Sequence, residues 1–358
     1  MLPLSPSTPA ELVDVVRSTP RLLAVGARTK PRLSQVEDDV ALLSMHGLSG
    51  IIEYDPSEFT FTALAGTPVR EIAAALAERG QYLPFDPLFL DAGATLGGTV
   101  AAGLSGPGRF RFGGVRNFIL GVRFVDGAGR LLRLGGKVVK NAAGFDVPKF
   151  MVGSLGRFGV LAEMTFKVFP RPTSTLTLKL TLNGIEDAAR VLTEAANTRW
   201  ELDALDALPD GKSVLLRLAA PEAAMAAIAR EILARWPGET LSAAEAVTVW
   251  SDIGEFRWAH SGQALIKVVI TAAQLPPLHH ATRSVNGMRI HVSAGGDVAY
   301  VSSLDGVAVD GVLRELGLRG MTLQGIGPIW RGIRQQTQIA RAVKKALDPQ
   351  GRFPALDD

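Results

Sequence analysis

The stretch from Ala92 to Gly108, AGATLGGTVAAGLSGPG, constrains the fold of this chain more than any other segment. Its seventeen residues include six glycines, no charge and only three bulky apolar side chains. The stretch is too rich in glycine and too short to span a bilayer, and glycine offers a core no side chain to bury. We therefore expect little core packing from it, and instead exposed backbone N–H groups that can bind a phosphate.

A basic segment follows this glycine stretch directly. Between Arg109 and Lys140 there are eight basic residues and one acid, Asp126. A basic segment usually forms a solvated face, but here Phe110, Phe112 and several glycines alternate with the charges, which fits a ligand wall better. Together, the two segments predict a site for the diphosphate of an anionic cofactor.

Composition sets limits on the function classes. With 358 residues, 47% hydrophobic and 20% charged, the chain is long enough for two globular domains. A net charge of +3 argues against a strong nucleic-acid binder. The absence of cysteine excludes a thiolate nucleophile and a Cys-ligated iron–sulfur cluster, so any such cluster would have to lie on another chain. The N-terminus lacks secretory features and no long apolar run occurs, so we expect a cytoplasmic protein whose membrane contact, if any, is peripheral and made through partners.

Local patterns predict alternating helices and strands. Thr8 and Glu11 form a capping-box pattern with Pro9 at the first helical position, which predicts a helix from Pro9 to Ser18. Asp126 to Gly129 predicts a hairpin turn. Periodicity predicts further helices at 67–79, 185–196, 221–236, 307–316 and 333–347, and strands at 22–25, 51–54, 60–65, 118–125, 130–134, 160–169, 176–182, 213–218, 265–270, 289–293 and 298–302.

The order of these elements indicates an α+β protein. Pro170-Arg171-Pro172 interrupts the pattern and gives a first domain at 1–172, with lobes at about 1–56 and 57–172. Two β-α-β-β-like units then predict an α+β second domain at 173–330, with an antiparallel sheet and helices on one face. We expect residues 331–358 to form a C-terminal helix and a tail that returns to the first domain.

Several familiar motifs are absent. The run at 153–159 has its glycines in GxxGxxG order and leads into a strand, so it is not a Rossmann turn, and by itself it could be a structural turn. No histidine pair has metal-ligand spacing, and we expect no metal site. His291 lies between Ile290 and Val292 in a predicted strand, where a structural role is favoured over a place in a substrate cavity.

Pro87 followed by Ala94-Thr95-Leu96-Gly97-Gly98 resembles the P…(A/S)-T-(I/L)-G-G segment of the vanillyl-alcohol oxidase/p-cresol methylhydroxylase (PCMH) type of FAD-binding domain. Other segments similar to the family's come in its order, at residues 26–30, 116–121, 126–127, 153–160 and 347–353. The resemblance implies a two-lobed PCMH-type FAD-binding domain followed by an α+β cap domain. It covers the first half of the chain densely and the second half only at its end.

Within this family, residues 106–146 are similar to the small FAD-binding E subunits of bacterial glycolate oxidases. That resemblance implies a complex with a larger FAD-binding catalytic subunit and an iron–sulfur subunit, which together oxidise glycolate, a small 2-hydroxy acid, to glyoxylate. Two alternatives stay open: an electron-transfer or assembly subunit that oxidises no substrate of its own, and a free-standing FAD-dependent 2-hydroxy-acid dehydrogenase.

Two departures from the family bear on these alternatives. Large catalytic flavoproteins of the group carry an E-H-G-(I/V)-G segment, whereas the comparable stretch here, Gln324 to Gly327, has no histidine. Positions at which some relatives attach FAD covalently hold neither histidine nor cysteine, so FAD is expected to be non-covalent.

The resemblance and the glycine pattern together give the expected site. Backbone N–H groups of Gly26–Lys30 and Ala94–Gly98 are expected to bind the diphosphate, residues 102–105 to lie along the flavin, and residues 156–161 to meet the adenine and ribose. The catalytic residues are unknown, with Arg109, Lys140 and His291 as candidates. The expected cofactor-binding residues are Gly26, Ala27, Arg28, Thr29, Lys30, Pro87, Ala94, Thr95, Leu96, Gly97, Gly98, Ala102, Gly103, Leu104, Ser105, Gly156, Gly159, Val160 and Leu161.

Overall fold

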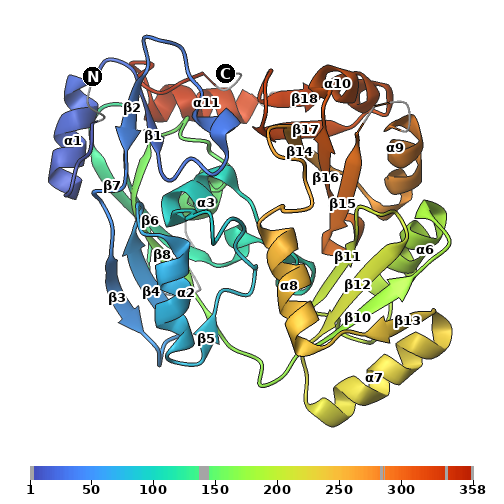
Figure 1. The fold of residues 1–358 in the computed structure, drawn as a ribbon. Coiled ribbons are helices and arrows are strands. Elements are labelled where there is room, and N and C mark those ends of the chain that lie inside the picture. Colours follow the sequence, from blue (N-terminus) through green and yellow to red (C-terminus); the bar gives the residue numbers. More distant parts are fainter. Residues whose placement is uncertain (1–3, 137–144, 283–284, 286, 335–337, 356–358) are drawn as a thin grey trace. The chain divides into compact units, whose positions relative to one another are not determined.

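The computed structural model describes residues 4–136, 145–282, 285, 287–334 and 338–355 (Figure 1). Contacts divide the chain into two compact units. The first unit comprises residues 1–105, 114–171 and 335–358, and the second comprises residues 106–113 and 172–334. Eight residues, beginning with the last three of the glycine stretch, therefore belong to the second unit before the chain returns to the first.

The first unit contains two sheets and a two-stranded ribbon. A parallel pair joins β1 (Leu22–Val25) to β2 (Ala41–Ser44), and β5 (Gln81–Tyr82) pairs with β9 (Phe169–Pro170). The five-stranded antiparallel sheet has the order β3 (Ile51–Asp55), β4 (Thr60–Leu64), β8 (Val160–Lys167), β6 (Ile119–Val125) and β7 (Leu131–Gly135). The helices are α1 (Pro9–Ser18), α2 (Val69–Ala77), α3 (Leu96–Ala102), α5 (Val147–Met151) and α11 (Gln338–Leu347).

The first helix begins and ends where the sequence predicts. The Thr8 side chain accepts a hydrogen bond from the Glu11 amide, and Pro9 occupies the first turn of α1. The carboxylate of Glu11, however, accepts from the amide and hydroxyl of Ser7 instead of completing a capping box with Thr8. The predicted hairpin is also confirmed, since β6 and β7 are antiparallel and Asp126 accepts from the amides of Ala128 and Arg130.

The glycine stretch departs from expectation because part of it is a buried helix. The side chain of Thr95 caps the start of α3, and Gly103, with φ 61°, ends it in the left-handed conformation. Leu96 and Val100 are fully buried. A Cβ added at Gly97 would lie 2.9 Å from the Cβ of Ala65, so glycine lets α3 approach the end of β4. The expectation that this run contributes little to a core is therefore wrong.

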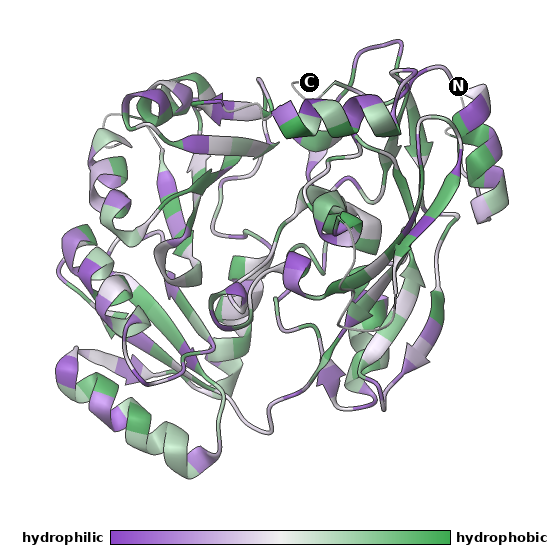
Figure 2. Ribbon diagram, turned by 180° about the vertical axis from the view of Figure 1, so that it is seen from behind, coloured by the Kyte–Doolittle hydropathy of each residue, from purple (hydrophilic) through white to green (hydrophobic). Residues whose placement is uncertain are grey.

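The C-terminal segment is tied to the first unit by polar contacts. The ammonium of Lys344, in α11, donates to Asp348 and to the carbonyls of Arg157 and Phe353. The guanidinium of Arg352 donates to the carbonyls of Thr19 and Gly127. Figure 2 shows hydrophilic and hydrophobic residues side by side along α11. The tail thus connects the end of α1, the β6–β7 turn and the loop before β8.

The second unit is built on one nine-stranded antiparallel sheet, ordered β13-β10-β12-β11-β15-β16-β14-β17-β18. Its first half consists of β10 (Leu176–Thr181), α6 (Ile185–Ala196), β11 (Ala204–Ala207), β12 (Ser213–Leu218), α7 (Glu222–Arg235) and β13 (Gly238–Thr240). The second half consists of β14 (Ala264–Val269), α9 (Leu275–Thr282), β15 (Arg289–Ser293), β16 (Val298–Ser303), α10 (Gly306–Glu315), β17 (Arg319–Gln324) and β18 (Trp330–Gly332). Each half has a β-α-β-β-α-β order, and β18 adds an edge strand.

Most predicted elements of this unit are confirmed, and several real ones were missed. Strands β12 and β15 and helix α6 have the predicted bounds. The missed elements are β11, β13, β17, β18, α4 (Arg109–Phe112) and α8 (Ala243–Gly254). Short strands and a four-residue helix give too few residues for a periodic signal.

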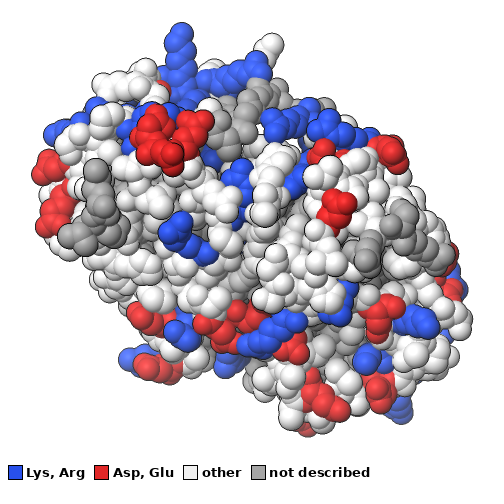
Figure 3. All heavy atoms as spheres, turned by 45° about the horizontal axis from the view of Figure 1, so that its top comes forward, with Lys and Arg blue, Asp and Glu red and all other residues white. Residues whose placement is uncertain are grey.

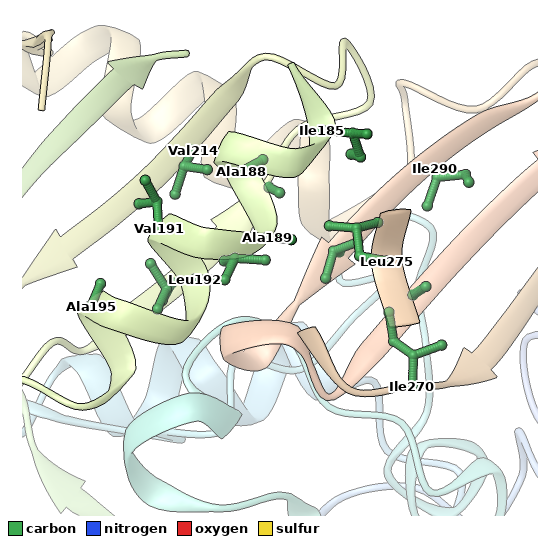
Figure 4. Packing of buried hydrophobic residues seen from close by; sticks show 14 of the residues in the cluster. Ile185, Ala188, Ala189, Val191, Leu192, Ala195, Val214, Ile270, Leu275 and Ile290 are labelled. Carbon is green, nitrogen blue, oxygen red and sulfur yellow. The ribbon is translucent and has the colours of Figure 1, made fainter. Parts of the chain in front are cut away.

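The main core of the second unit lies between the sheet and its helices. Helix α6 buries one face, including Ala188, Val191 and Leu192, against strand residues such as Val214 and against Leu275 of α9 (Figure 4). Helices α7, α9 and α10 contribute to the same cluster. The sequence predicts helices on one face of this sheet, but helix α8 contacts the other face. Its Trp250 indole donates to Thr177, whose side chain projects away from the core because it alternates with the core residues of β10.

The two halves of the sheet meet between β11 and β15, where Ala207 and Val292 are the single register pair. The Asp206 side chain, fully buried, bridges this junction. Its carboxylate is 3.0 Å from Nε2 of His291 and accepts from the Ser293 hydroxyl at 3.0 Å and the Ala294 amide at 3.1 Å. One side chain therefore supplies much of the polar contact between the halves.

Replacing Asp206 by alanine should destabilise the protein strongly. The change leaves buried donors on Ser293 and Ala294 without partners, at a cost of about 1–3 kcal/mol for each group. We expect a loss of about 3 kcal/mol in the free energy of unfolding, measured by chemical denaturation. Asp252→Ala is the control, because its exposed pair with Arg257 should contribute less than about 1 kcal/mol. Equal effects of the two variants would contradict the assigned role of Asp206.

Candidate functional site: a cavity at the start of α3

A cavity in the first unit brings together three segments that are distant in the sequence. Its wall is formed by the end of β1 and the loop after it, by the start of α3, and by the loop before β8. The residues that line it are Leu23, Ala24, Val25, Gly26, Ala27, Arg28, Thr29, Lys30, Leu33, Ser34, Thr95, Gly98, Ala101, Ala102, Leu155 and Gly156. An adjoining cavity shares several of these residues and adds Met45, Ala65, Gly97, Ser154, Gly159 and Leu161.

The loop from Gly26 to Lys30 presents unused backbone donors. In the described part of the chain, none of these five amides donates a hydrogen bond to another protein group. Arg28 has φ 54°, a left-handed conformation that is costly for a residue with a side chain. Successive amides held in such a turn form a concave anion-binding surface. The loop is thus suited to bind a phosphate group.

Lys30 adds a buried ammonium group to the same cavity. It is 7% exposed, its Nζ donates to the Thr29 hydroxyl at 2.8 Å, and it lies 5.1 Å from the centre of the Phe89 ring. Among the described residues it has no carboxylate partner. Burial lowers the pKa of Lys30 from its usual 10.5 to about 8. A bound anion would supply the missing counter-charge.

The start of α3 forms part of the cavity wall, but most of its backbone amides already donate hydrogen bonds within the protein. The amides of Ala94, Leu96 and Gly97 donate to the carbonyls of Phe89, Thr67 and Ala65, and that of Gly98 donates to the Thr95 hydroxyl. Of the two segments expected to bind the diphosphate through amides, the Gly26–Lys30 loop leaves all five amides free in the described structure, whereas in Ala94–Gly98 only the Thr95 amide is unused.

Close packing joins these two segments. A Cβ added at Gly26 would lie 2.1 Å from Oγ1 of Thr95. No larger residue fits there unless the loop or the helix moves. Glycine at this position therefore holds the loop after β1 against the cap of α3.

Two buried hydroxyls in the described part of the first unit have no hydrogen-bond partner. The side-chain oxygens of Thr99 and Ser154 are buried and have no hydrogen-bond partner in the described structure. Ser154 lines the second cavity. A buried hydroxyl without a partner is costly, so a polar ligand group that reaches this region would restore the bond. Free amides, a buried cation and unsatisfied hydroxyls together fit a nucleotide cofactor with a diphosphate, such as FAD.

Most of the expected cofactor-binding residues come together here. Twelve of them line the two cavities: Gly26, Ala27, Arg28, Thr29, Lys30, Thr95, Gly97, Gly98, Ala102, Gly156, Gly159 and Leu161. The others, Pro87, Ala94, Leu96, Gly103, Leu104, Ser105 and Val160, do not line either cavity. Ser105 has a structural contact instead, since its hydroxyl accepts from the Val115 amide.

The three catalytic candidates lie elsewhere. Lys140 falls outside the described residues. Arg109 belongs to α4 and His291 to β15, both in the second unit. His291 is fully buried against Asp206, which agrees with the structural role that the sequence favours.

Sequence reasoning missed several lining residues, among them Met45, Ala65, Ala101 and Ser154. Met45 follows β2, which is parallel to β1, and ligands often bind beyond the carboxyl ends of parallel strands. That rule would have found Met45 if β2 had been recognised. Ala101 lies on α3 three residues after Gly98, a neighbour that a helical reading of the glycine stretch would have given.

Comparison with known proteins identifies relatives of the first part of the chain. Residues 3–135 match the family described as "FAD binding domain". The chain is 46% identical over 156 residues to glycolate oxidase subunit GlcE of Escherichia coli (strain K12). The aligned residues make up 44% of this chain and 43% of that protein. It is 29% identical over 158 residues to glycolate oxidase subunit GlcD of Bacillus subtilis (strain 168), covering 44% and 33% of the two chains.

Other relatives are hydroxy-acid dehydrogenases. D-2-hydroxyglutarate dehydrogenase of Xanthomonas citri pv. viticola is 32% identical over 142 residues, covering 39% of this chain and 30% of that protein. The matches thus span less than half the length of these curated relatives. Among solved structures, an alkyldihydroxyacetonephosphate synthase aligns with 97% of this chain and 75% of its own at 15% identity, with a TM-score of 0.71. This likeness shows the predicted fold class.

The first part of the chain is therefore a PCMH-type FAD-binding domain, and its cofactor is FAD.

No group of side chains suited to hold a metal ion occurs among the described residues. In the same part of the chain, no helix is long and apolar enough to cross a membrane. On the face drawn in Figure 3, basic and acidic side chains are interspersed, so this face does not carry charge of one sign.

Gly26→Ala should weaken FAD binding while the protein still folds. The added methyl overlaps Thr95 and displaces the loop from α3, and such overpacking costs about 1–3 kcal/mol. We expect the dissociation constant for FAD, measured by calorimetry, to rise about tenfold or more. Gly136→Ala is the matched control, because its Cβ would meet nothing within 4 Å. Unchanged affinity in Gly26→Ala would count against the site.

FAD affinity should also depend on pH through Lys30. Burial lowers the pKa of its ammonium to about 8 in the free protein, and a bound diphosphate favours the charged form and raises that pKa again. Affinity should therefore be constant below pH 8 and fall by up to about tenfold per pH unit above it.

Two variants separate this effect from others in the pH titration. Lys30→Met should bind FAD more weakly than the wild type below pH 8, and its affinity should no longer fall above pH 8. Arg28→Gln removes a neighbouring positive charge but leaves the Lys30 ammonium in place, so its affinity should still fall above pH 8. A wild-type affinity that is flat from pH 7 to pH 10 would contradict a charged contact from Lys30.

Proposed function

We propose that this chain, a member of the PCMH-type FAD-binding family, is the FAD-binding subunit of a glycolate oxidase complex. In that complex a small 2-hydroxy acid, glycolate, is oxidised to glyoxylate, and electrons pass through the flavin to a partner iron–sulfur subunit. A larger FAD-binding catalytic subunit is the other partner.

The observation that carries this proposal is the loop of five unused amides beside the buried Lys30, inside a domain that matches the FAD-binding family. The relatives named above supply the substrate class, since their names refer to the oxidation of glycolate or of D-2-hydroxyglutarate. The absence of cysteine is compatible with an iron–sulfur cluster on a separate chain.

In the proposal, each segment of the site has a distinct task. The Gly26–Lys30 loop binds the diphosphate through its amides and the Lys30 ammonium, and Thr95 fixes the position of that loop. Ser154, which lines the adjoining cavity, donates to a polar atom of the bound cofactor. FAD, held without a covalent bond, would supply the redox chemistry, and the protein would orient it and set the charges around it.

A second function, an electron-transfer or assembly subunit that oxidises nothing alone, is favoured by one specific feature. The segment Gln324 to Gly327, comparable with the histidine-bearing segment of the large flavoproteins, lacks histidine. Its Ile326 is 90% exposed, which is unusual for a large apolar side chain and fits contact with a partner protein.

The proposal also includes the organisation and location inferred from the sequence. We assign FAD binding to residues 1–172 and a cap to residues 173–330, with residues 331–358 returning to the first domain. We place the protein in the cytoplasm, where contact with the membrane would be made through partner subunits.

Anaerobic mixing of the purified, FAD-loaded chain with glycolate or D-lactate tests the proposal. Loss of the oxidised flavin's visible absorption would show that the chain oxidises the acid itself. Reduction that needs the two partner subunits would favour the second function. A chain that binds no FAD, or an assembled complex that leaves both acids unchanged, would contradict the proposed function.

A further inference from the structure

Two walls of the candidate FAD cavity contain strained backbone. Arg28, in the loop after β1, has φ 54°, and Leu155, in the loop before β8, has φ 50°. Both residues line the cavity. A left-handed conformation in a residue with a side chain costs free energy, and it persists only where the surrounding structure holds it. Contacts outside the cavity are therefore needed to keep both walls in place.

The loop before β8 is closely packed against the other two walls. A Cβ added at Gly156 would lie 2.9 Å from Cδ1 of Leu23, which belongs to β1. The amide of Leu155 donates to the carbonyl of Ala101, in α3, at 2.9 Å. A shift of this loop would therefore change the cavity on all of its sides.

Lys344, in α11, holds this loop from outside the cavity. Its ammonium donates to the carbonyl of Arg157 at 2.7 Å, and Arg157 directly follows the lining residue Gly156. The same ammonium donates to the carboxylate of Asp348 at 2.7 Å and to the carbonyls of Phe353 and Pro354 at 3.0 and 3.1 Å. Lys344 thus joins the loop before β8 to three residues of the C-terminal tail.

The same tail also holds the start of β1. The carbonyl of Arg352 accepts from the amide of Leu22 at 2.8 Å, and the Arg352 guanidinium donates to the carbonyl of Thr19 at 2.7 Å. Leu22 directly precedes the lining residues of β1, which are Leu23 to Val25. On two walls of the cavity, therefore, the tail contacts the residue next to those that line it.

Asp348 makes these two contacts depend on each other. Its side chain is fully buried and accepts from the amides of Arg352 and Phe353 at 2.9 and 3.0 Å, in addition to the Lys344 ammonium. A Cβ added at Gly127 would lie 2.2 Å from Oδ1 of Asp348, so glycine in the β6–β7 turn makes room for this carboxylate. Because Asp348 connects Lys344 to Arg352, loss of the Lys344 contact should loosen the tail at both walls.

We propose that residues 344–354 are a positioning element of the FAD site and that Lys344 is its positioning residue. The docked tail holds the loop before β8 and the start of β1 in the conformation that binds FAD. Tail docking and FAD binding therefore favour each other, and this coupling acts equally in both directions. The inference rests on the FAD site of the proposed function, and it is independent of the substrate that the complex oxidises.

Titration of the full-length chain with FAD tests the first direction of this coupling. Lys344→Met removes the ammonium and keeps a long side chain, and the dissociation constant for FAD should rise about tenfold. Lys345→Met is the matched control, because it removes the same charge from an exposed position on the same helix. It should change the dissociation constant less than about twofold. Lys344→Arg, which keeps the charge and can donate to the same carbonyls, should restore part of the affinity.

Hydrogen exchange of the wild-type chain tests the opposite direction and does not depend on the folding of a variant. Added FAD should slow exchange of the Arg352 and Phe353 amides several-fold, because both donate to Asp348 in the docked tail. The amides of α7, in the second unit, serve as the reference and should exchange at an unchanged rate.

The outcomes separate this inference from the proposed function. Circular dichroism checks that each variant is folded at the temperature of the titration, so a loss of stability alone leaves the affinity for FAD unchanged. If Lys344→Met and Lys345→Met bind FAD equally, or if FAD leaves exchange of the Arg352 and Phe353 amides unchanged, the inference is overturned while FAD binding by the chain stands. A wild-type chain that binds no FAD would overturn both.

Discussion

The contact between Gly26 and Thr95 is the constraint on which the candidate FAD site depends. With no side chain at Gly26, the loop after β1 lies directly against the cap of α3. Gly97 has a similar effect one turn into the helix, where it lets α3 pack on Ala65 at the end of β4. These two approaches place a loop with unused amides beside a buried helix, and a cavity remains between them. The C-terminal tail supports the third wall, because Lys344 binds the carbonyl of Arg157 in the loop before β8.

The second unit depends on a different kind of contact. Its two halves have the same order of elements and are joined at β11 and β15 through the buried carboxylate of Asp206. One face of the combined sheet buries an apolar core under helices, and the other carries His291, Tyr300 and Lys267. Nε2 of His291 contacts Asp206, and its Nδ1 has no hydrogen-bond partner among the described residues.

Much of the fold followed from local signals. Helix α1 and helix α6 begin and end as predicted, because capping residues and apolar spacing act within a few residues of one another. The glycine stretch shows the limit of such signals. Local reasoning treated it as exposed backbone, yet α3 is buried, since whether small residues pack closely depends on Ala65, which is about thirty residues away in the chain. Strand β2 was missed for a related reason, because its pairing with β1 is made across a loop of more than ten residues.

By itself, the sequence determined the α+β class, the FAD-binding type of the first domain and most of the segments that line its cavity. These properties are carried by residue types and their order, such as the glycines before α3 and the loop that contains Lys30. Only the tertiary structure decided which amides remain available, because the donors of Leu96 and Gly97 are used by carbonyls from other segments whereas those of Gly26 to Lys30 are not. It alone also decided that Lys30 is buried, since burial arises from packing between segments that no local pattern connects.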